Sequence, residues 1–298
     1  MKFSEIQLNV AADQAIAGIQ KHIPSISLFA RSFSSQAGEQ FNGVAVPVFG
    51  NADGAKVQDA KNPATDVWGS GEALNGAVIS LDKNISKVYA LTDMEAASAD
   101  NLYLADGARA IADQLTLACA KYVFTEVLKD ANLTAVLGTG DALSSYTATA
   151  PSDKAGFAGL FATASDAGLN PYDCVLVLNA TKFAALMGAL DSSVYGGPDA
   201  VRNGVIEGLY GFRGVVMSPF LNEGVKGYII PYNCLGVVSR WDKPAIDGYS
   251  EVWTAVDAKT GFTVGYRAYE DLVKGKAFIG GNILFGAKVL QKGIIKLT

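Results

Sequence analysis

The stretch LNPYDCVLVLNATKFAAL, residues 169–186, carries the pattern of a strand followed directly by a helix. Asn170-Pro171 predicts a turn, and the apolar run CVLVL over 174–178 predicts a strand that is buried on both faces. Asn179 then stands where the N-cap of a helix is expected. The core face of that helix is predicted at apolar positions i, i+3, i+4 and i+7, which are Phe183, Leu186, Met187 and Leu190. The stretch therefore predicts a compact α/β unit, and nothing in it points to a chemical role.

The longest helical signal of the chain covers residues 98–129. Apolar residues recur there at spacings of four and three residues, and they are Leu104, Ala108, Ile111, Leu115, Ala118 and Tyr122. One stripe with this spacing predicts a single α-helix, which at 1.5 Å per residue would be about 48 Å long. A small globule rarely needs such a helix, so we expect it to be a spine along which other parts of the molecule are arranged.

The remaining elements are predicted more weakly. A second helix is expected over 153–167, where Gly168 closes it. Residues 250–298 are patterned almost entirely as strands, without a helical stripe. Residues 1–35 mix short apolar pairs with polar breaks, which predicts an arm with at most a weak helix over Asp13–His22.

Residues 41–91 are expected to begin and end as strands. The run FNGVAVPVFG predicts an edge strand, because Pro47 cannot donate a ladder hydrogen bond. AVISL and KVYAL flank the polar turn 82–86 and predict a hairpin. The polar segment 51–76 is too long for an ordinary turn, so we expect a projecting loop. Its Trp68 is expected to pack either on its own hairpin or against a partner.

The composition excludes several classes of function. The 298 residues carry a net charge of −5, which argues against general binding of polyanions. Only 18% of the residues are charged and 50% are hydrophobic, whereas about a quarter of an ordinary soluble protein is charged. The chain contains no run of about 18 apolar residues, which is the length needed to span a membrane. The start of the chain does not have the pattern of a signal peptide. We therefore expect much of the surface to be buried against other subunits.

The three cysteines, Cys119, Cys174 and Cys234, lie far apart among apolar neighbours. They are expected to be reduced core residues of a protein made in a cytoplasm.

No motif of the chain predicts a reaction. His22 is the only histidine, so one chain cannot build a histidine metal cluster or a catalytic triad. GSGEAL at 69–74 and GTGDAL at 138–143 begin like a dinucleotide-binding fingerprint but lack its third glycine. The sequence therefore predicts no catalytic, cofactor-binding or metal-binding residue, and no cofactor.

The order of the predicted elements resembles the major capsid proteins of tailed bacteriophages, whose Hong Kong 97-type fold is also found in encapsulins. Three segments carry the resemblance: LNPYDCVLVLNATKFAAL at 169–186, GVIEGLYGFRGVVMSPFL at 204–221 and GFTVGYRAYED at 261–271. The resemblance implies an α+β fold with an N-arm, an E-loop, a peripheral domain built on the spine helix, and an axial domain. The implied limits are 1–35 for the extended arm, 36–91 for the E-loop, 92–152 for the peripheral domain, 153–245 for the axial domain, and 246–298 for the return to the peripheral domain.

The resemblance further implies a structural protein that assembles through hexamers and pentamers into an icosahedral shell around double-stranded DNA. It implies assembly in the host bacterial cytoplasm, a separate scaffolding protein, a portal, and no catalytic activity. Two alternatives stay open: an encapsulin-like shell around a protein cargo, and an α/β enzyme with an unrecognised carboxylate site.

One charge asymmetry lies in the last part of the chain, where Lys274, Lys276, Lys288, Lys292 and Lys296 stand against Asp271 alone. In a continuous strand, Lys288, Lys292 and Lys296 would share a face. That face is expected to be solvated, to discourage aggregation at a sheet edge, or to be a mildly basic surface turned toward packaged DNA. Because the rest of the chain is acidic, we expect any such contact with DNA to be weak.

Overall fold

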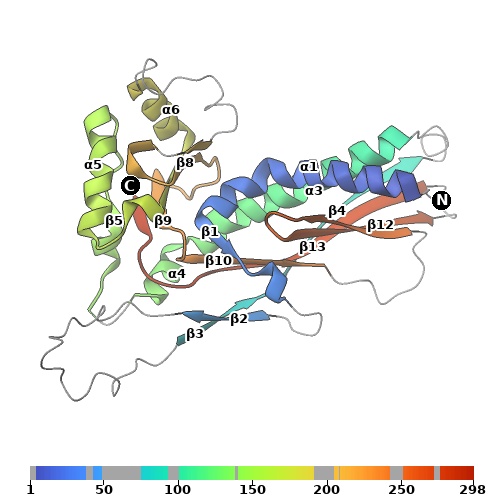
Figure 1. Cartoon of the computed structure of the whole chain (residues 1–298), viewed down its shortest axis with the longest axis horizontal. Coiled ribbons are helices and arrows are strands. Elements are labelled where there is room, and N and C mark those ends of the chain that lie inside the picture. The colour runs from blue at the N-terminus through green and yellow to red at the C-terminus, as the bar shows by residue number, and fades with distance from the viewer. Residues whose placement is uncertain are drawn as a thin grey trace, which may run out of the picture.

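The computed structural model describes residues 5–37, 43–48, 75–92, 101–137, 140–190, 205–207, 209–241, 251–271 and 276–298. These residues form two bodies around two six-stranded sheets, together with a small two-stranded sheet (Figure 1). We call the two bodies the long-sheet body and the mixed-sheet body.

The long-sheet body consists of a sheet and two helices that lie side by side on one of its faces (Figure 1). Its strands follow the order β1-β10-β13-β12-β11, with β4 paired to one end of β13. The bounds are α1 Glu5–Phe29, β1 Ala30–Ser32, η1 Ser34–Gln36, β4 Lys83–Thr92, α3 Asn101–Tyr122, β10 Leu235–Arg240, β11 Glu251–Asp257, β12 Phe262–Asp271 and β13 Lys276–Val289.

Helix α3 confirms the predicted spine. Of the six residues of the predicted stripe, Leu104, Ala108, Ile111 and Leu115 are buried, while Ala118 and Tyr122 are half-buried. The helix ends as an α-helix at Tyr122 and continues as a five-residue π-helix, η2, over Val123–Val127. A Cβ atom added to Gly281 on β13 would lie 2.4 Å from Cγ2 of Ile111, so a glycine at this place lets the helix approach the sheet closely.

Helix α1 differs from the extended arm expected over 1–35. It is a 25-residue helix that packs along α3, and the weak helix expected over Asp13–His22 is only its middle. A glycine allows the two helices to come close: a Cβ on Gly18 would lie 2.6 Å from the carbonyl oxygen of Arg109. Ala11, Ala15 and Ile19 of α1 are buried. Small residues contribute little to an apolar stripe but let two helices come close, so the sequence pattern underestimated this helix.

A buried carboxylate ties α1 to the turn between β11 and β12. Asp257 is only 2% exposed. Its oxygens accept hydrogen bonds from the side chains of Gln20 at 3.2 Å and Thr260 at 2.5 Å, and from the backbone N–H of Lys259 at 3.5 Å. Burial acts to raise the pKa of Asp257, but these hydrogen bonds outweigh it and hold the pKa below its usual value.

The mixed-sheet body lies at one end of the long-sheet body (Figure 1). Its strands follow the order β5-β14-β9-β6-β8-β7, and helices α5 and α6 pack on the sheet. The bounds are α4 Asp130–Ala135, η3 Leu143–Tyr146, β5 Thr147–Ala148, α5 Lys154–Asp166, η4 Pro171–Asp173, β6 Cys174–Leu178, α6 Ala180–Ala189, β7 Val205–Glu207, η6 Leu209–Gly211, β8 Gly214–Met217, β9 Gly227–Pro231 and β14 Ile295–Leu297, where α4 and η3 belong to the connection from α3.

The α/β unit predicted from residues 169–186 is confirmed at the centre of this body. All five residues of β6 are buried, between the parallel strand β8 and the antiparallel strand β9. The side chain of Asn179 caps α6 by accepting a hydrogen bond from the backbone N–H of Lys182 at 2.9 Å. Phe183 and Leu186 are buried, while Met187 and Leu190 are half-buried. The helix predicted over 153–167 is α5, which begins after its N-cap Asp153.

The prediction of a hairpin around residues 82–86 is wrong, although both of the predicted strands are present. Strand β3, Asn75–Ser80, pairs with β2, Gly43–Val48, and these two strands form the small sheet that contains Pro47. Strand β4 turns away and pairs with ten residues of β13. The long register with β13 offers β4 more hydrogen bonds than the six-residue β3 could. Residues 49–74, with Trp68, lie outside the described residues.

The two sheets also divide the chain differently from the expected domain limits. Strand β10 lies in the range expected to be axial, yet it pairs with β13 in the long sheet. Strands β5 and β14 lie in ranges expected to be peripheral, yet they pair with each other in the mixed sheet. The expected limits followed the order of the sequence, whereas sheet membership follows strand pairing between distant segments.

Candidate functional site

A hollow of about 270 Å³ lies on the long sheet and is lined by residues such as Asn84, Arg267 and Asn282. Among the described residues, no group of three or more His, Cys, Asp or Glu side chains is placed to hold a metal ion.

The three cysteines are buried and free of disulfides. Burial raises the pKa of Cys174 and of Cys234 to about 12, and it also raises that of Cys119. A thiol with such a pKa forms almost no thiolate at neutral pH, so these side chains are unreactive core residues. This confirms their predicted core position.

The three lysines singled out in the sequence do not share one strand face. Lys288 lies on β13, Lys292 lies in a bend, and Lys296 lies on β14 in the other sheet. The chain turns between the two strands at Gly293, whose φ of +126° suits glycine. The three positions therefore do not lie on one continuous strand, so the three lysines do not share a strand face.

Each of the three lysines instead joins two separate segments. Lys288 donates a hydrogen bond to the carbonyl oxygen of Val78 on β3 at 3.1 Å. Lys292 pairs with Asp141 at 2.7 Å, and Lys296 contacts both oxygens of Asp130 at 2.9 Å. Two of the three positive charges are thus engaged within the chain.

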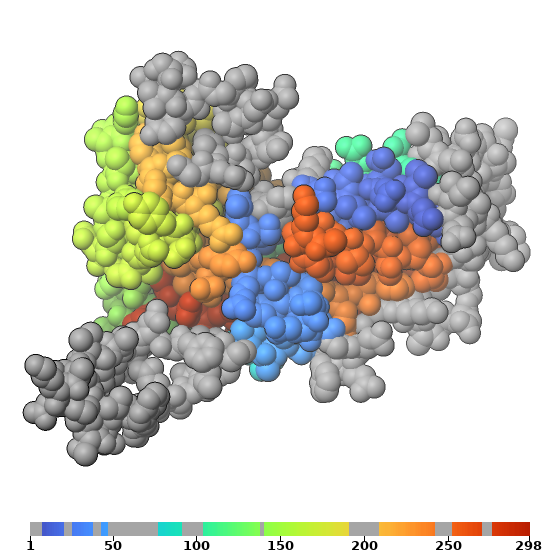
Figure 2. Space-filling model, viewed as in Figure 1, coloured from blue at the N-terminus to red at the C-terminus, as the bar shows by residue number. Residues whose placement is uncertain are grey.

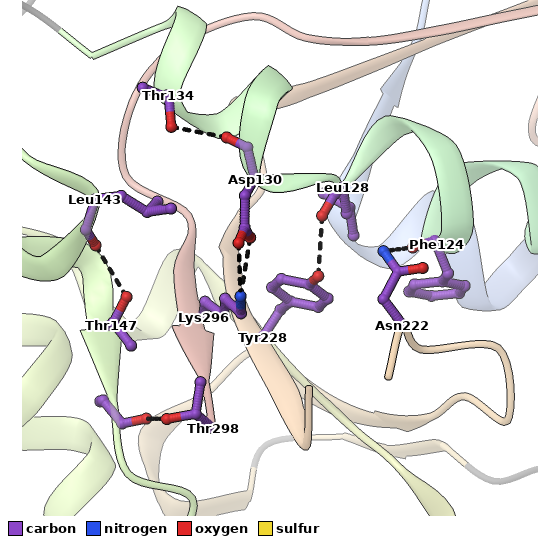
Figure 3. Close-up of polar contacts among 11 residues, drawn as sticks. Phe124, Leu128, Asp130, Thr134, Leu143, Thr147, Asn222, Tyr228, Lys296 and Thr298 are labelled. Carbon is purple, nitrogen blue, oxygen red and sulfur yellow. Dashed lines mark hydrogen bonds and ion pairs between the residues drawn. The ribbon is translucent and has the colours of Figure 1, made fainter. Parts of the chain in front are cut away.

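The end of the spine helix is where the two bodies meet (Figure 3). The π-helix closes with a hydrogen bond from the backbone N–H of Leu128 to the carbonyl oxygen of Val123 at 3.1 Å. Carbonyl groups at a helix end lack partners within the helix. The Leu128 carbonyl accepts a hydrogen bond from the Tyr228 hydroxyl at 2.9 Å, and the Phe124 carbonyl accepts a long one from the Asn222 side chain at 3.5 Å. The mixed-sheet body therefore caps the spine.

A second contact lies directly beside the first. Lys296 on β14 and Tyr228 on β9 are opposite one another in the strand register. Both side chains reach the turn that follows the spine helix, where Lys296 meets Asp130 (Figure 3). Burial, and then the nearby Asp130 carboxylate, raise the pKa of Tyr228, so its hydroxyl stays a neutral donor. We call these two contacts, Tyr228 to Leu128 and Lys296 to Asp130, the junction clamp.

Local sequence patterns do not predict the junction clamp. Tyr228 is a single polar group within the apolar run GYIIP, and Asp130 directly follows the segment predicted as the spine helix. A buried tyrosine hydroxyl needs a partner, but the partner lies 100 residues away in the chain. Only the fold brings the two together.

Large apolar side chains are exposed on both bodies and on the small sheet. Val78 is 51% exposed, Val88 49%, Val256 47% and Tyr172 65%. In Figure 2, α1 and the β11–β12 hairpin make up one half of the visible face, and α5 lies on the other half. Scattered exposed apolar residues are common on proteins, but strand β4 exposes Val88 and its neighbour Tyr89, which point to opposite faces of the strand. Neither face of β4 is therefore fully covered by the other described residues.

Comparisons with known proteins agree on one family and one fold. A family model described as phage capsid protein matches residues 76–279. No curated protein sequence matches the chain. No helix within the described parts of the chain has the length and apolar character needed to cross a membrane.

Solved structures match nearly the whole chain. A structure from Mycobacterium phage Che8 has 20% identity and a TM-score of 0.51, and the match covers 92% of this chain and 90% of that one. One from Microbacterium phage Oxtober96 has 14% identity and a TM-score of 0.52, with coverages of 92% and 90%. The capsid of an empty GTA particle has 12% identity and a TM-score of 0.53, with coverages of 90% and 93%. Likeness at these identities shows a common fold.

Proposed function

Because the chain belongs to the phage capsid protein family, we propose that it is the major head protein, whose copies form an icosahedral shell around double-stranded DNA. The Hong Kong 97-type fold expected from the sequence is confirmed by the match to solved phage structures over 92% of the chain. The proposal rests mainly on this structural match, which extends over both bodies and includes the long spine helix. A capsid protein has its place in the virion.

The long-sheet body with α3 corresponds in this proposal to the peripheral domain, and the mixed-sheet body to the axial domain. The β2–β3 sheet forms the base of the E-loop. Strand pairing supports limits that differ from those of the sequence, because β10 joins the peripheral part while β5 and β14 join the axial part. The exposed Val78, Val88 and Val256 are candidates for burial between copies.

The proposed protein acts as a structural subunit without catalysis or cofactor. Its partners are other copies of itself in hexamers and pentamers, a separate scaffolding protein and a portal, and assembly takes place in the host bacterial cytoplasm. Contact with DNA is weak in this proposal. Lys292 and Lys296 already pair with aspartates, so they add little to the counterion release on which such binding depends.

An encapsulin-like compartment is the second candidate from the sequence, but the family match to phage capsid proteins favours the first. The two differ in what assembly requires. An encapsulin assembles alone around a protein cargo, whereas the proposed head protein needs scaffolding for uniform closed shells.

Size-exclusion chromatography and negative-stain electron microscopy test the proposal. The chain is expressed alone and together with the proposed scaffolding protein. We expect uniform closed shells with the scaffolding protein, and irregular particles or free subunits without it. Uniform cargo-filled shells from the chain alone would favour the compartment. A compact monomer under every scaffold and salt condition would overturn both.

A further inference from the structure

We propose that the junction clamp sets the angle between the mixed-sheet body and the spine helix, and thereby the curvature of the shell. The inference rests on the proposed function, because curvature has a meaning only for a subunit that assembles. It assigns a positioning role to Tyr228 and Lys296.

The connections between the two bodies meet close to the clamp. Within the described residues the chain passes between the bodies three times: after α3, between β9 and β10, and between β13 and β14. The second and third connections are bonded together, because the backbone N–H of Leu290 donates to the carbonyl oxygen of Cys234 at 2.8 Å. The Lys292–Asp141 pair ties the third connection to the first. The bodies are thus joined at one compact region.

The apolar contact between the two bodies is extensive, but it does little to fix their relative orientation. One buried cluster includes Leu115 and Phe124 of the spine together with Val177 and Ile230 of the mixed sheet. Apolar burial is non-directional, so this core holds the bodies together and tolerates small rotations. Hydrogen bonds depend steeply on distance and angle. The directed contacts across the same region therefore determine the orientation.

The clamp supplies two directed contacts at different points. Tyr228 holds the carbonyl of Leu128, and Lys296 holds the side chain of Asp130 two residues later. A single contact would allow rotation about itself, while two contacts from neighbouring strands restrict that rotation. The contacts also differ in chemistry: the tyrosine hydroxyl is buried, while the side chain of Asp130 is 54% exposed and open to screening by salt.

A small rotation at the clamp has a large effect at the other end of the subunit. Helix α3 begins at the end of the long-sheet body farthest from the mixed sheet and ends next to the clamp (Figure 1). Its 22 residues span about 33 Å at 1.5 Å per residue. A rotation of about 5° at the clamp would move the far end of such a helix by about 3 Å. Shifts of this size, repeated in every copy, change which closed shell the subunits can form.

The test compares variants that weaken the clamp with variants that remove the same chemistry elsewhere. Tyr228→Phe removes the hydroxyl and keeps the ring, and Lys296→Met removes the charge and keeps the length of the side chain. The matched control for the first is Tyr266→Phe, because the buried Tyr266 hydroxyl also donates to a carbonyl, that of Ala108, at 2.9 Å, but within the long-sheet body.

Two further variants complete the set. Lys83→Met is the control for the loss of charge, since Lys83 pairs at 3.0 Å with the adjacent Asp82 and does not bridge the bodies. Lys296→Arg keeps the ion pair and serves as the conservative variant. Each variant is assembled with the scaffolding protein, and shell diameters are measured by cryo-electron microscopy. Thermal unfolding of the unassembled subunits reports folding separately.

The Tyr228→Phe and Lys296→Met double variant is expected to give a diameter distribution at least twice as broad as that of the wild type, or a second size class. Tyr266→Phe, Lys83→Met and Lys296→Arg are expected to keep the wild-type diameter. Raised salt during assembly is expected to broaden the wild-type distribution as Lys296→Met does. Each single clamp variant is measured as well, so the test does not depend on the double variant folding.

Wild-type diameters from folded clamp variants would overturn the inference, and so would an equal broadening by Tyr266→Phe. A folded clamp variant that forms no shells while Tyr266→Phe does would also overturn it, since the inference concerns curvature and not the ability to assemble. Failure of the wild-type chain to form shells would instead refute the proposed function.

Discussion

Replacing Gly281 with alanine tests the close approach of the spine helix to the long sheet. The added Cβ would lie 2.4 Å from Cγ2 of Ile111 and 3.4 Å from both Leu115 and Tyr266. Contacts between carbon atoms are favourable at about 3.5–4.0 Å, so the helix or the strand must move. Ile111 is β-branched and stiff at its first torsion, and it is fully buried. We expect a loss of about 1–3 kcal/mol in the free energy of unfolding, as for other overpacked cores.

The experiment is a double-mutant cycle with Ile111→Ala, followed by urea unfolding of unassembled subunits. Ile111→Ala alone is expected to cost about 2–5 kcal/mol because it leaves a cavity. It also removes the methyl group that Gly281→Ala strikes, so the second substitution is expected to be nearly neutral or favourable in that background. The coupling energy should be about 1–3 kcal/mol.

Gly107→Ala on the same helix is the control. No atom lies within 4 Å of an added Cβ there, so the better helix propensity of alanine is expected to raise the free energy of unfolding by about 0.5–1 kcal/mol. A Gly281→Ala substitution that is neutral, or that adds to Ile111→Ala without coupling, would refute the close packing of the helix on β13.

Three further predictions concern the core, the loop and the pH dependence of stability. Leu115→Asp is expected to abolish soluble folding, because it buries a charge without a partner; a soluble variant with the wild-type circular dichroism would contradict the helix register. Deletion of residues 53–72 is expected to leave a folded subunit that forms no shells, since β2 and β3 stay paired up to Val48 and Asn75; normal shells by electron microscopy would contradict this. Asp257→Asn is expected to lower the urea midpoint at pH 7 and to lower it by less at pH 3. The pKa of Asp257 is lower in the folded state, so its contribution is present above the unfolded value of about 4 and is lost as the pH falls through the folded value; an equal loss at both pH values would contradict it.

The parts of the fold that the sequence predicted depend on neighbours along the chain. The strand and cap at CVLVLN and the stripe from Leu104 to Leu115 are local patterns, because the residues that decide them lie within two helical turns. Helix α1 was predicted only over Asp13–His22, within an arm, for a different reason. Gly18 lies directly against α3, and a local pattern does not reveal the partner that such a close approach requires.

The parts that the sequence did not predict depend on pairing at a distance. Strand β4 was expected to pair with β3, its nearest neighbour in sequence, but pairs with β13. The junction clamp joins residues separated by 100 and 166 positions. Lys296 looked like one member of a basic row, and only the position of β14 in the mixed sheet shows that its partner is Asp130. Charge spacing predicts a surface only when the underlying strand is continuous.

The position of β14 in the middle of the mixed sheet has a consequence for synthesis. Strand β14 lies between β5 and β9, so the register of Ala148 with Leu297 joins segments made far apart in time. At about 5–20 residues per second, the ribosome needs roughly 7–30 s between these two positions. Until Leu297 has left the exit tunnel, β5 lacks its neighbour and the sheet stays open. A nascent chain therefore cannot complete the mixed sheet until β14 has been made, and any association that depends on the complete sheet has to wait for that strand.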